Sequence, residues 1–223
     1  MTLVAVSKSQ PPEAIVAAFE AGCRDFGESY VQDALPKIAA LRDMKCAWHF
    51  VGRLQRNKAR EVAERFDWVH GVDRAKIAAA LGGARPPGLA RLNVCLQVNI
   101  SGEATKGGVA PALAGALARE VVAIPGLALR GLMGMAGETG DIAAQRAQFA
   151  HLARIFDELR ASGLALDTLS MGMSQDFEAA LAEGATMVRI GTAIFGERAT
   201  RSSEKPSPYP QRDPLSRERG KRT

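Results

Sequence analysis

Aromatic residues, cysteines and histidines are all scarce in this sequence, and each scarcity argues against a class of function. Aromatic residues make up 5% of the 223 residues and are not interleaved with basic charges, so we expect no specific nucleic-acid partner. Cys23, Cys46 and Cys95 lie far apart, with no histidines at metal-ligand spacing. We therefore expect reduced thiols, no disulfide and no metal site, as in a cytoplasmic protein.

Long apolar runs are missing as well. No run reaches the length that crosses a bilayer, and no signal peptide opens the chain, so we expect neither membrane association nor secretion. Hydrophobic residues make up 47% of the chain and charged residues 24%, which is ordinary for a globular protein with one sizeable core.

The formal net charge of +5 comes from one end of the chain. Residues 198–223 contain eight Lys or Arg and three Asp or Glu, so the rest of the chain is neutral. This segment is rich in Ser, Pro and Arg and almost free of aliphatic residues. We predict one folded domain over 1–197 and a disordered basic tail over 198–223. A weak RNA contact through the tail is an alternative that solvation explains more simply.

Eight short apolar runs alternate with seven stretches of helical spacing. This alternation predicts parallel strands joined by right-handed crossovers, and eight units are the number that closes a TIM-type (β/α)8 barrel. A doubly wound open sheet is the alternative. The expected strands are 3–8, 25–29, 48–52, 68–73, 93–100, 127–135, 168–173 and 187–195. The expected helices are 12–22, 30–41 with an interruption at Pro36, 57–66, 76–81, 110–124, 142–162 and 176–183.

Lys8 stands at the carboxyl end of the first predicted strand, just before Pro11 and Pro12 stop strand pairing. Open α/β sheets and α/β barrels place their chemistry at that edge. Partial desolvation disfavours the ammonium form of a lysine, and a neutral amine can form a Schiff base. The alternative is a lysine that only extends its charge into solvent at a strand end.

A phosphate site is expected at the ends of the last two strands. Strand alternation places Val188 and Ile190 against the helices and sends Arg189 toward the barrel mouth, where it needs a polar partner. Gly191 and Thr192 follow, and Ser174 supplies a hydroxyl after the preceding strand. Barrels commonly bind phosphate at these two loops. Ser174 could instead cap the next helix. A lysine, an arginine and a phosphate cradle together suggest a phosphorylated aldehyde cofactor.

Five motifs resemble the pyridoxal 5′-phosphate (PLP) homeostasis proteins, in the same order along the chain. The most specific is WHFVGRLQRNK at 48–58. The others are AVSK at 5–8, FGE at 26–28, LSMGMS at 169–174 and VRIGTAIFG at 188–196. The resemblance runs from about residue 3 to residue 198. It implies the barrel of the alanine racemase N-terminal domain.

The resemblance also implies roles for individual residues. Lys8 would form a Schiff base with PLP, Arg189 would face the pyridine nitrogen, and the phosphate would be held by Ser174, Gly191 and Thr192. A guanidinium accepts no proton, so it keeps that nitrogen unprotonated and the ring a weak electron sink.

Three further positions, two of them in the signature at 48–58, are expected near the site. His49 could contact the cofactor or form hydrogen bonds within the barrel, and Asn57 should lie near the third loop of the mouth. Ser29, expected close to the cofactor ring, stands where relatives usually have asparagine. Relatives also carry a helix before the first strand, so we expect the outer face around Leu3 and Val188 to be poorly covered.

These observations predict a PLP-binding protein that sequesters and supplies the cofactor without dedicated turnover. PLP-dependent apoenzymes are the expected recipients. A monomer is expected, with a weak dimer as the alternative. The competing hypothesis is an enzyme of the same fold, such as an amino-acid racemase. Its second acid/base comes from an additional β-domain, which we do not recognise in this sequence. A Schiff-base aldolase acting on a sugar phosphate is a third hypothesis.

Overall fold

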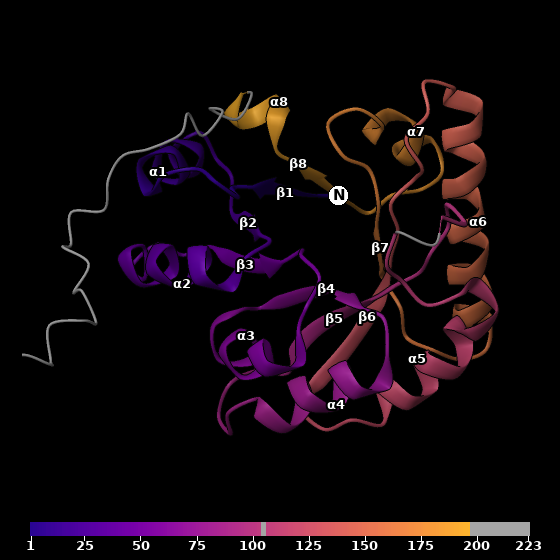
Figure 1. Cartoon of the computed structure of the whole chain (residues 1–223), viewed down its shortest axis with the longest axis horizontal. Helices are drawn as coiled ribbons and strands as arrows, with labels where there is room; N and C mark the ends of the chain where they lie inside the picture. Colours follow the sequence, from indigo (N-terminus) through magenta and orange to yellow (C-terminus); the bar gives the residue numbers. More distant parts are fainter. Residues whose placement is uncertain (104–105, 197–223) are drawn as a thin grey trace, which may run out of the picture.

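The computed structural model describes residues 1–103 and 106–196, and its strands form one closed parallel barrel (Figure 1). Each strand pairs with the next one along the chain, and β1 closes the barrel by pairing with β8, where Leu3 lies opposite Val188. The predicted barrel is confirmed and the open sheet is wrong. The strands are β1 (Thr2–Val6), β2 (Asp25–Glu28), β3 (Ala47–Phe50), β4 (Trp68–Val72), β5 (Leu92–Gln97), β6 (Leu127–Met133), β7 (Thr168–Ser170) and β8 (Met187–Ile190).

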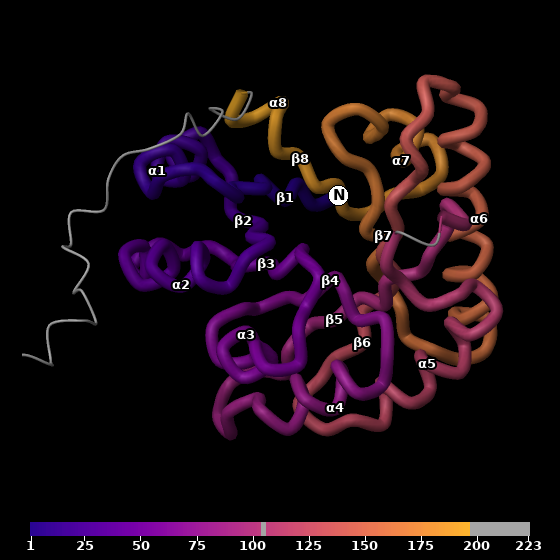
Figure 2. Tube along the Cα trace, in the orientation of Figure 1, coloured from indigo at the N-terminus to yellow at the C-terminus, as the bar shows by residue number. Residues whose placement is uncertain are grey.

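Helices follow one another around the outside of the barrel in chain order (Figure 2). This arrangement results from the repeated strand–helix crossovers, each of which returns the chain to the next parallel strand. The helices are α1 (Pro12–Glu20), α2 (Val31–Ala40), η1 (Arg56–Lys58), α3 (Ala59–Arg65), α4 (Ala75–Ala84), η2 (Pro111–Leu113), α5 (Ala114–Val122), α6 (Ile142–Ala161), α7 (Phe177–Ala182) and α8 (Thr192–Phe195), of which η1 and η2 are 3-10 turns.

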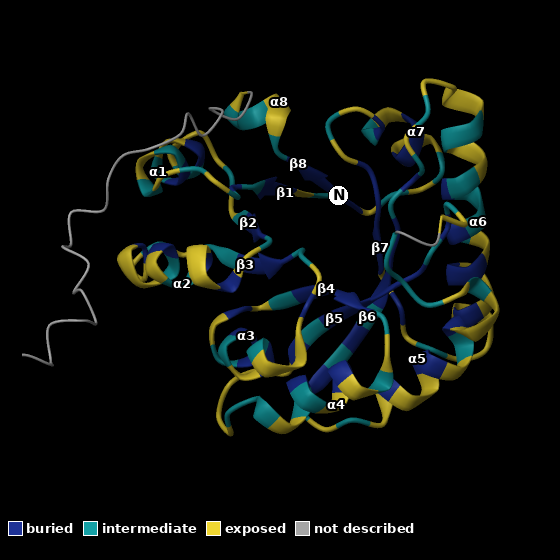
Figure 3. Cartoon of the chain, viewed as in Figure 1, coloured by how far each residue is buried: buried dark blue, intermediate teal, exposed yellow. Residues whose placement is uncertain are grey.

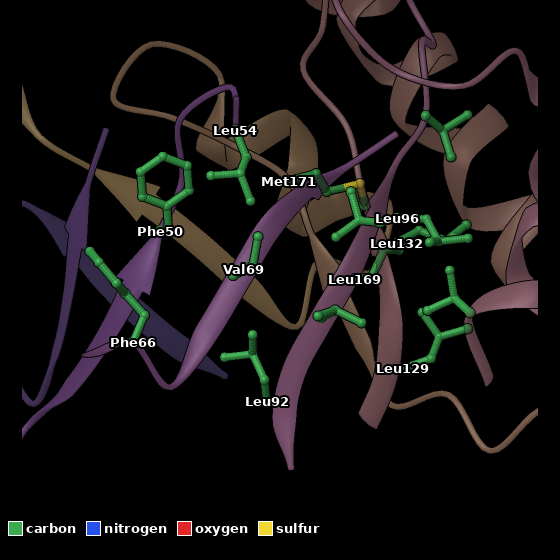
Figure 4. Close-up of a cluster of buried hydrophobic side chains, with 14 of the residues drawn as sticks. Phe50, Leu54, Phe66, Val69, Leu92, Leu96, Leu129, Leu132, Leu169 and Met171 are labelled. Atoms are coloured by element: carbon green, nitrogen blue, oxygen red, sulfur yellow. The ribbon is translucent and has the colours of Figure 1, made fainter. Parts of the chain in front are cut away.

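The main apolar core is the layer between strands and helices, where buried residues concentrate (Figures 3 and 4). Phe50 of β3 meets Phe66 at the end of α3, with ring centroids 5.5 Å apart and an angle of 82° between the rings. Leu96 and Leu132 are fully buried on neighbouring strands. Complete burial of such a side chain stabilises the fold by about 1.5–3 kcal/mol, so this layer holds the strand ends in a fixed arrangement.

Among the expected elements that differ from the structure, two concern segments next to the site. Pro36 lies inside α2 and does not interrupt it, because the helix is anchored by the buried residues Val31, Ala34 and Lys37. The last strand was expected to reach Phe195 but ends at Ile190, opposite Ala5 of β1. Beyond that pair the chain leaves the ladder and turns into α8, whose residues 194 and 195 donate backbone hydrogen bonds to Gly191 O.

The outer face of β1 and β8 is better covered than expected. Ala5 is fully buried, Val188 is 3% exposed and Ile190 is 7% exposed, and only Leu3 of the four is exposed, at 41%. The expectation of a poorly covered face is therefore wrong except at Leu3.

No helix within the described ranges combines the length and apolar character needed to span a bilayer. In the same ranges, no cluster of three or more His, Cys, Asp or Glu could hold a metal ion. The predicted tail, 198–223, lies outside the described residues.

Candidate functional site

A cavity of about 400 Å³ opens beside Lys8 at the carboxyl ends of the first three strands. Its described lining contains three basic side chains, of which Lys58 pairs with Glu61 at 3.1 Å, and no acidic one, so it favours an anionic ligand. The lining residues are Lys8, Ser29, Tyr30, Val31, Gln32, Phe50, Gly52, Arg53, Leu54, Gln55 and Lys58. Of the residues predicted from the sequence, this cavity brings together Lys8 and Ser29.

The backbone on both sides of Lys8 is tightly constrained. Ser7 N donates to Gly27 O at 2.9 Å, and Gln10 N donates back to Ser7 O at 3.0 Å. Ser9 adopts a φ of 63°, in the left-handed region that non-glycine residues rarely occupy. Strained backbone of this kind persists where the surrounding structure imposes it. Lys8 is therefore held in a sharp turn at the end of β1, half-buried.

Behind this turn lies a buried ion pair between α2 and β2. Lys37 Nζ is 2.8 Å from Glu28 Oε1 and also donates to Ser7 O at 3.0 Å. Ser7 Oγ donates to the same carboxylate oxygen at 2.6 Å. The other oxygen, Glu28 Oε2, is buried and has no hydrogen-bond partner among the described residues. The pair ties the backbone preceding Lys8 to a helix of the outer layer.

The loops after β7 and β8 meet at Ser174. The backbone N–H of Ala193 in α8 donates to Ser174 Oγ at 3.4 Å, which brings Ser174 to the turn that contains Gly191 and Thr192. Ser174 does not cap α7. The N-cap is Asp176, because it lies directly before Phe177, the first residue of α7. The Asp176 carboxylate accepts a hydrogen bond from Met173 N.

The same turn lies next to the end of β1. A Cβ on Gly191 would lie 3.4 Å from Val6 O, which is ordinary contact with the strand that leads to Lys8. The three residues predicted to hold phosphate are therefore close together, and Gly191 and Thr192 follow the strand that pairs with β1.

Arg189 points into the barrel and is 5% exposed. Its Nη1 donates to Ser170 Oγ at 2.6 Å and to Ser170 O at 2.8 Å, and its Nη2 donates to Gly134 O at 3.1 Å. Burial lowers the pKa of this guanidinium to about 10. The expected polar partner is thus present, and it consists of uncharged acceptors on β7 and after β6.

His49 and Asn57 lie away from the cavity wall. His49 is fully buried, with Nε2 2.9 Å from Asp25 Oδ1 and Nδ1 2.9 Å from His70 Nε2. In this structure both of its nitrogens are engaged within the barrel, the second of the two roles expected for it. Asn57 is exposed on η1, between the lining residues Gln55 and Lys58.

Sequence reasoning missed several residues that shape the site. Ser170 lies in a quoted motif and His70 in an expected strand, but neither is among the predicted site residues. The available signal was a polar residue in an otherwise apolar strand, which strand alternation would have directed into the barrel. Arg53 stands in the signature motif, and its basic charge was not linked to the cavity.

Comparison with known proteins places this geometry in a family. The model of the alanine racemase N-terminal domain matches residues 1–199. A pyridoxal phosphate homeostasis protein of Pseudomonas aeruginosa is 57% identical over 196 residues, which are 88% of this chain and 84% of that protein. The chain belongs to the pyridoxal phosphate homeostasis protein family. Of the quoted motifs, all lie within the range that the family model matches.

Solved structures agree with this family and its fold. PipY of Synechococcus elongatus, whose structure has PLP bound, is 40% identical with a TM-score of 0.80, over 88% of this chain and 92% of that one. An alanine racemase of Clostridium difficile is 12% identical with a TM-score of 0.74, over 92% of this chain and 55% of that one, and shows the shared fold alone. Members of the homeostasis family thus share this barrel with a larger enzyme.

Proposed function

We propose that this protein binds PLP through a Schiff base to Lys8 and sequesters the cofactor until it is supplied elsewhere. The observation that carries the proposal is the position of Lys8, half-buried at the end of β1 in a cavity lined by Arg53 and Lys58. A basic wall attracts an anionic aldehyde to the amine that can react with it. The PLP-bound PipY supports the same ligand.

The phosphate is assigned to the loops after β7 and β8. Ser174 offers a hydroxyl, and Gly191 and Thr192 offer backbone N–H groups at the start of α8. Such N–H groups have no helical acceptor and bind anions well. The residues present therefore fit a phosphorylated ligand whose other end reaches Lys8 after the adjacent strand, β1.

Other predicted residues take supporting roles in this proposal. Ser29 shares the cavity with Lys8 and contacts the cofactor ring. Asn57 does not line the cavity, but it is exposed between two lining residues and would turn toward the ligand from the rim. Arg189 faces the ring nitrogen, since it points into the barrel from β8, which pairs with β1, and Lys8 follows in the turn after β1. His49 acts from inside the barrel through its contact with His70.

We propose that binding and release, rather than dedicated turnover, are the function. Arg189 can only donate hydrogen bonds and cannot give the ring nitrogen a partner that accepts its proton, so it does not favour a strongly electron-withdrawing ring. The recipients are PLP-dependent apoenzymes of the cytoplasm, a compartment in keeping with the free thiols of Cys23, Cys46 and Cys95. We propose that the protein acts as a monomer.

The test is the visible absorption spectrum of the protein with PLP, followed by borohydride reduction and peptide mapping. We expect a Schiff-base band and a reduced adduct on the peptide containing Lys8. Lys8→Arg should abolish both. Lys106→Arg is the matched control, because Lys106 lies after β5, paired with Glu103 at 3.3 Å and donating to Ala136 O. A band that persists in Lys8→Arg would refute the proposal.

Carrier and enzyme are separated by two further measurements on the same PLP-loaded protein. Chiral chromatography of amino acids after prolonged incubation measures racemisation, and recovery of activity by a PLP-dependent apoenzyme measures transfer. The proposal predicts that PLP is transferred to the apoenzyme and that the amino acids are not racemised. Racemisation that depends on Lys8 would favour the enzyme hypothesis.

A further inference from the structure

A continuous chain of hydrogen bonds crosses the barrel interior from Asp25 to Arg189. Asp25 Oδ1 is 2.9 Å from His49 Nε2, and His49 Nδ1 is 2.9 Å from His70 Nε2. His70 Nδ1 is 2.9 Å from Ser170 Oγ, which accepts from Arg189 Nη1 at 2.6 Å. Since β4 and β7 are separated by β5 and β6 in the sheet, the His70–Ser170 bond must span the interior.

The chemistry of the two ends gives these bonds one direction. A guanidinium only donates, so Arg189 donates to Ser170 Oγ, and an ionised carboxylate only accepts, so Asp25 accepts from His49 Nε2–H. A neutral His49 must then accept at Nδ1 from His70 Nε2–H. His70 in turn accepts at Nδ1 from the hydroxyl of Ser170. Every proton in the chain has an acceptor.

The opposite direction leaves a buried donor unsatisfied. If His49 carried two protons, it would donate to His70, and His70 would donate to Ser170 Oγ. Ser170 would then accept from both His70 and Arg189, and no acceptor for its own proton is found among the described residues. An unmade buried hydrogen bond is costly, so the Arg189-to-Asp25 direction is favoured.

The surroundings hold the chain rigidly. His49 and His70 are fully buried, and His49 stacks on Trp68 with ring centroids 5.4 Å apart and an angle of 6°. Trp68 is covered in turn by Arg130, 5.2 Å from its ring centroid, and Arg130 pairs with Asp167. Burial, His49 and Arg189 together lower the pKa of His70 well below its usual value, which keeps its imidazole neutral. Among the five residues of the hydrogen-bond chain, only Asp25 is appreciably exposed to solvent, with a side chain 27% exposed.

We propose that Ser170 and His70 are positioning residues, which hold the Arg189 guanidinium toward the cofactor's ring nitrogen, and that His49 and Asp25 fix their protons in place. Ser170 offers Arg189 two acceptors, its hydroxyl and its carbonyl, and a hydroxyl that donates its own proton to His70 keeps its oxygen lone pairs for Arg189. The amino end of β2, where Asp25 lies, thereby contributes to the cofactor site at the carboxyl ends of the strands. The last step, at the ring nitrogen, rests on the proposed function, whereas the chain itself does not.

The chain is tested first in the cofactor-free protein, by nitrogen-detected NMR of the imidazoles. The sequence has three histidines, and the third, His151 on α6, is not part of this hydrogen-bond chain. We expect both His49 and His70 at neutral pH to be the tautomer protonated at Nε2 alone. A proton on Nδ1 of either ring would overturn the assignment. Because no ligand is present, this result does not depend on whether Lys8 binds PLP.

The positioning role is tested with PLP by comparing Ser170→Ala with Thr168→Val. Thr168 is two residues earlier on the same strand and 5% exposed, but its hydroxyl donates to Asp167, which is not part of the hydrogen-bond chain. Without the Ser170 hydroxyl, Arg189 is held less firmly, the ring nitrogen takes up a proton more easily, and the attached imine becomes less basic. We expect the pH midpoint of the visible band to fall by about one unit in Ser170→Ala, with no shift in Thr168→Val.

Ser170→Thr, which keeps a hydroxyl, should restore the midpoint. An unshifted midpoint in a folded, PLP-binding Ser170→Ala protein would overturn the positioning role and leave the binding proposal standing. Loss of the band in unmodified protein would instead refute the binding proposal. If Ser170→Ala does not fold, the same comparison is made with His70→Gln.

Discussion

The ammonium group of Lys37 lies 2.8 Å from Glu28 Oε1, and this buried pair joins α2 to β2 directly behind the turn that carries Lys8. The Lys37 side chain is 10% exposed and the Glu28 side chain is fully buried. Taking two charges out of water is costly, and each charge depends on the other to offset that cost. The pair also holds Ser7 through its carbonyl and its hydroxyl, so its loss reaches the site.

Replacing Lys37 by methionine is therefore expected to lower the free energy of unfolding by about 3–5 kcal/mol, since Glu28 keeps a buried charge without its partner. Urea denaturation measures the loss. Lys45→Met, at an exposed lysine, is the control and should change stability little. Adding Glu28→Gln to Lys37→Met should recover part of the loss, because the carboxylate is gone and an acceptor for Ser7 remains. Equal effects of Lys37→Met and Lys45→Met would contradict this account.

His70 makes stability depend on pH in a predictable direction. Its pKa in the folded protein is well below the usual value of 6.5 because burial disfavours the charged imidazole. Above pH 6.5, the pKa of the unfolded chain, neither state binds a proton at this site. Between pH 6.5 and the lower pKa of the folded protein, the unfolded chain takes up a proton that the folded protein does not. The free energy of unfolding therefore falls as pH falls through this range, by up to about 1.4 kcal/mol per pH unit.

The measurement is urea denaturation at about pH 7.5 and about pH 5.5. The His70→Asn variant should lose less stability between these two pH values than the unmodified protein. Ser170→Ala breaks the hydrogen bond between Ser170 and His70 without removing a titratable group, so its free energy of unfolding should depend on pH as steeply as that of the unmodified protein. A His70→Asn protein with an unchanged pH dependence would show that this imidazole does not carry the effect.

Sequence reasoning predicted the barrel because eight repeats of one pattern leave few topologies. The placement of Lys8 and of Ser174, Gly191 and Thr192 at one end followed from the same argument, since the carboxyl ends of parallel strands coincide. That part required no knowledge of side-chain packing.

Other features could not be predicted, because they depend on the third dimension. The contact between His70 and Ser170 joins residues 100 positions apart and depends on the stagger of strands around the closed barrel. Pro36 disfavours a helix locally, yet the buried side of α2 outweighs that preference. The exposure of Asn57 depends on a 3-10 turn, η1, that helical spacing does not distinguish from α3.

The three thiols should react very differently. Cys95 is fully buried inside the barrel, and burial raises its pKa to about 12, whereas Cys23 and Cys46 are partly exposed. Burial, with Asp67 and Asp25 nearby, also raises the pKa of Cys46. Because the thiolate is the reactive form, a disulfide reagent at about pH 8 should modify Cys23 fastest and Cys46 more slowly. It should modify Cys95 only after the protein unfolds. Mass mapping of timed samples identifies each site, and modification of Cys95 in the folded protein would refute the ranking.

Gly52 provides the most direct steric test of the cavity, because it lies on the wall beside Ser29. A Cβ at this position would come within 2.2 Å of Ser29 O, a backbone atom that cannot rotate away. Gly52→Ala must therefore displace the end of β2 or β3, and overpacking of this kind costs about 1–3 kcal/mol. We expect PLP binding, measured by titration of the visible band, to weaken by about tenfold or more.

The matched control is Gly83→Ala on α4, where an added Cβ meets nothing within 4 Å. Alanine is favoured over glycine in a helix, so this variant should gain up to about 1 kcal/mol in stability and bind PLP normally. If Gly52→Ala lowers stability while PLP affinity stays at the level of Gly83→Ala, the wall formed by Ser29 and Gly52 does not contact the ligand. The cofactor would then lie nearer Ser174 and Thr192, and the role assigned to Ser29 would be wrong.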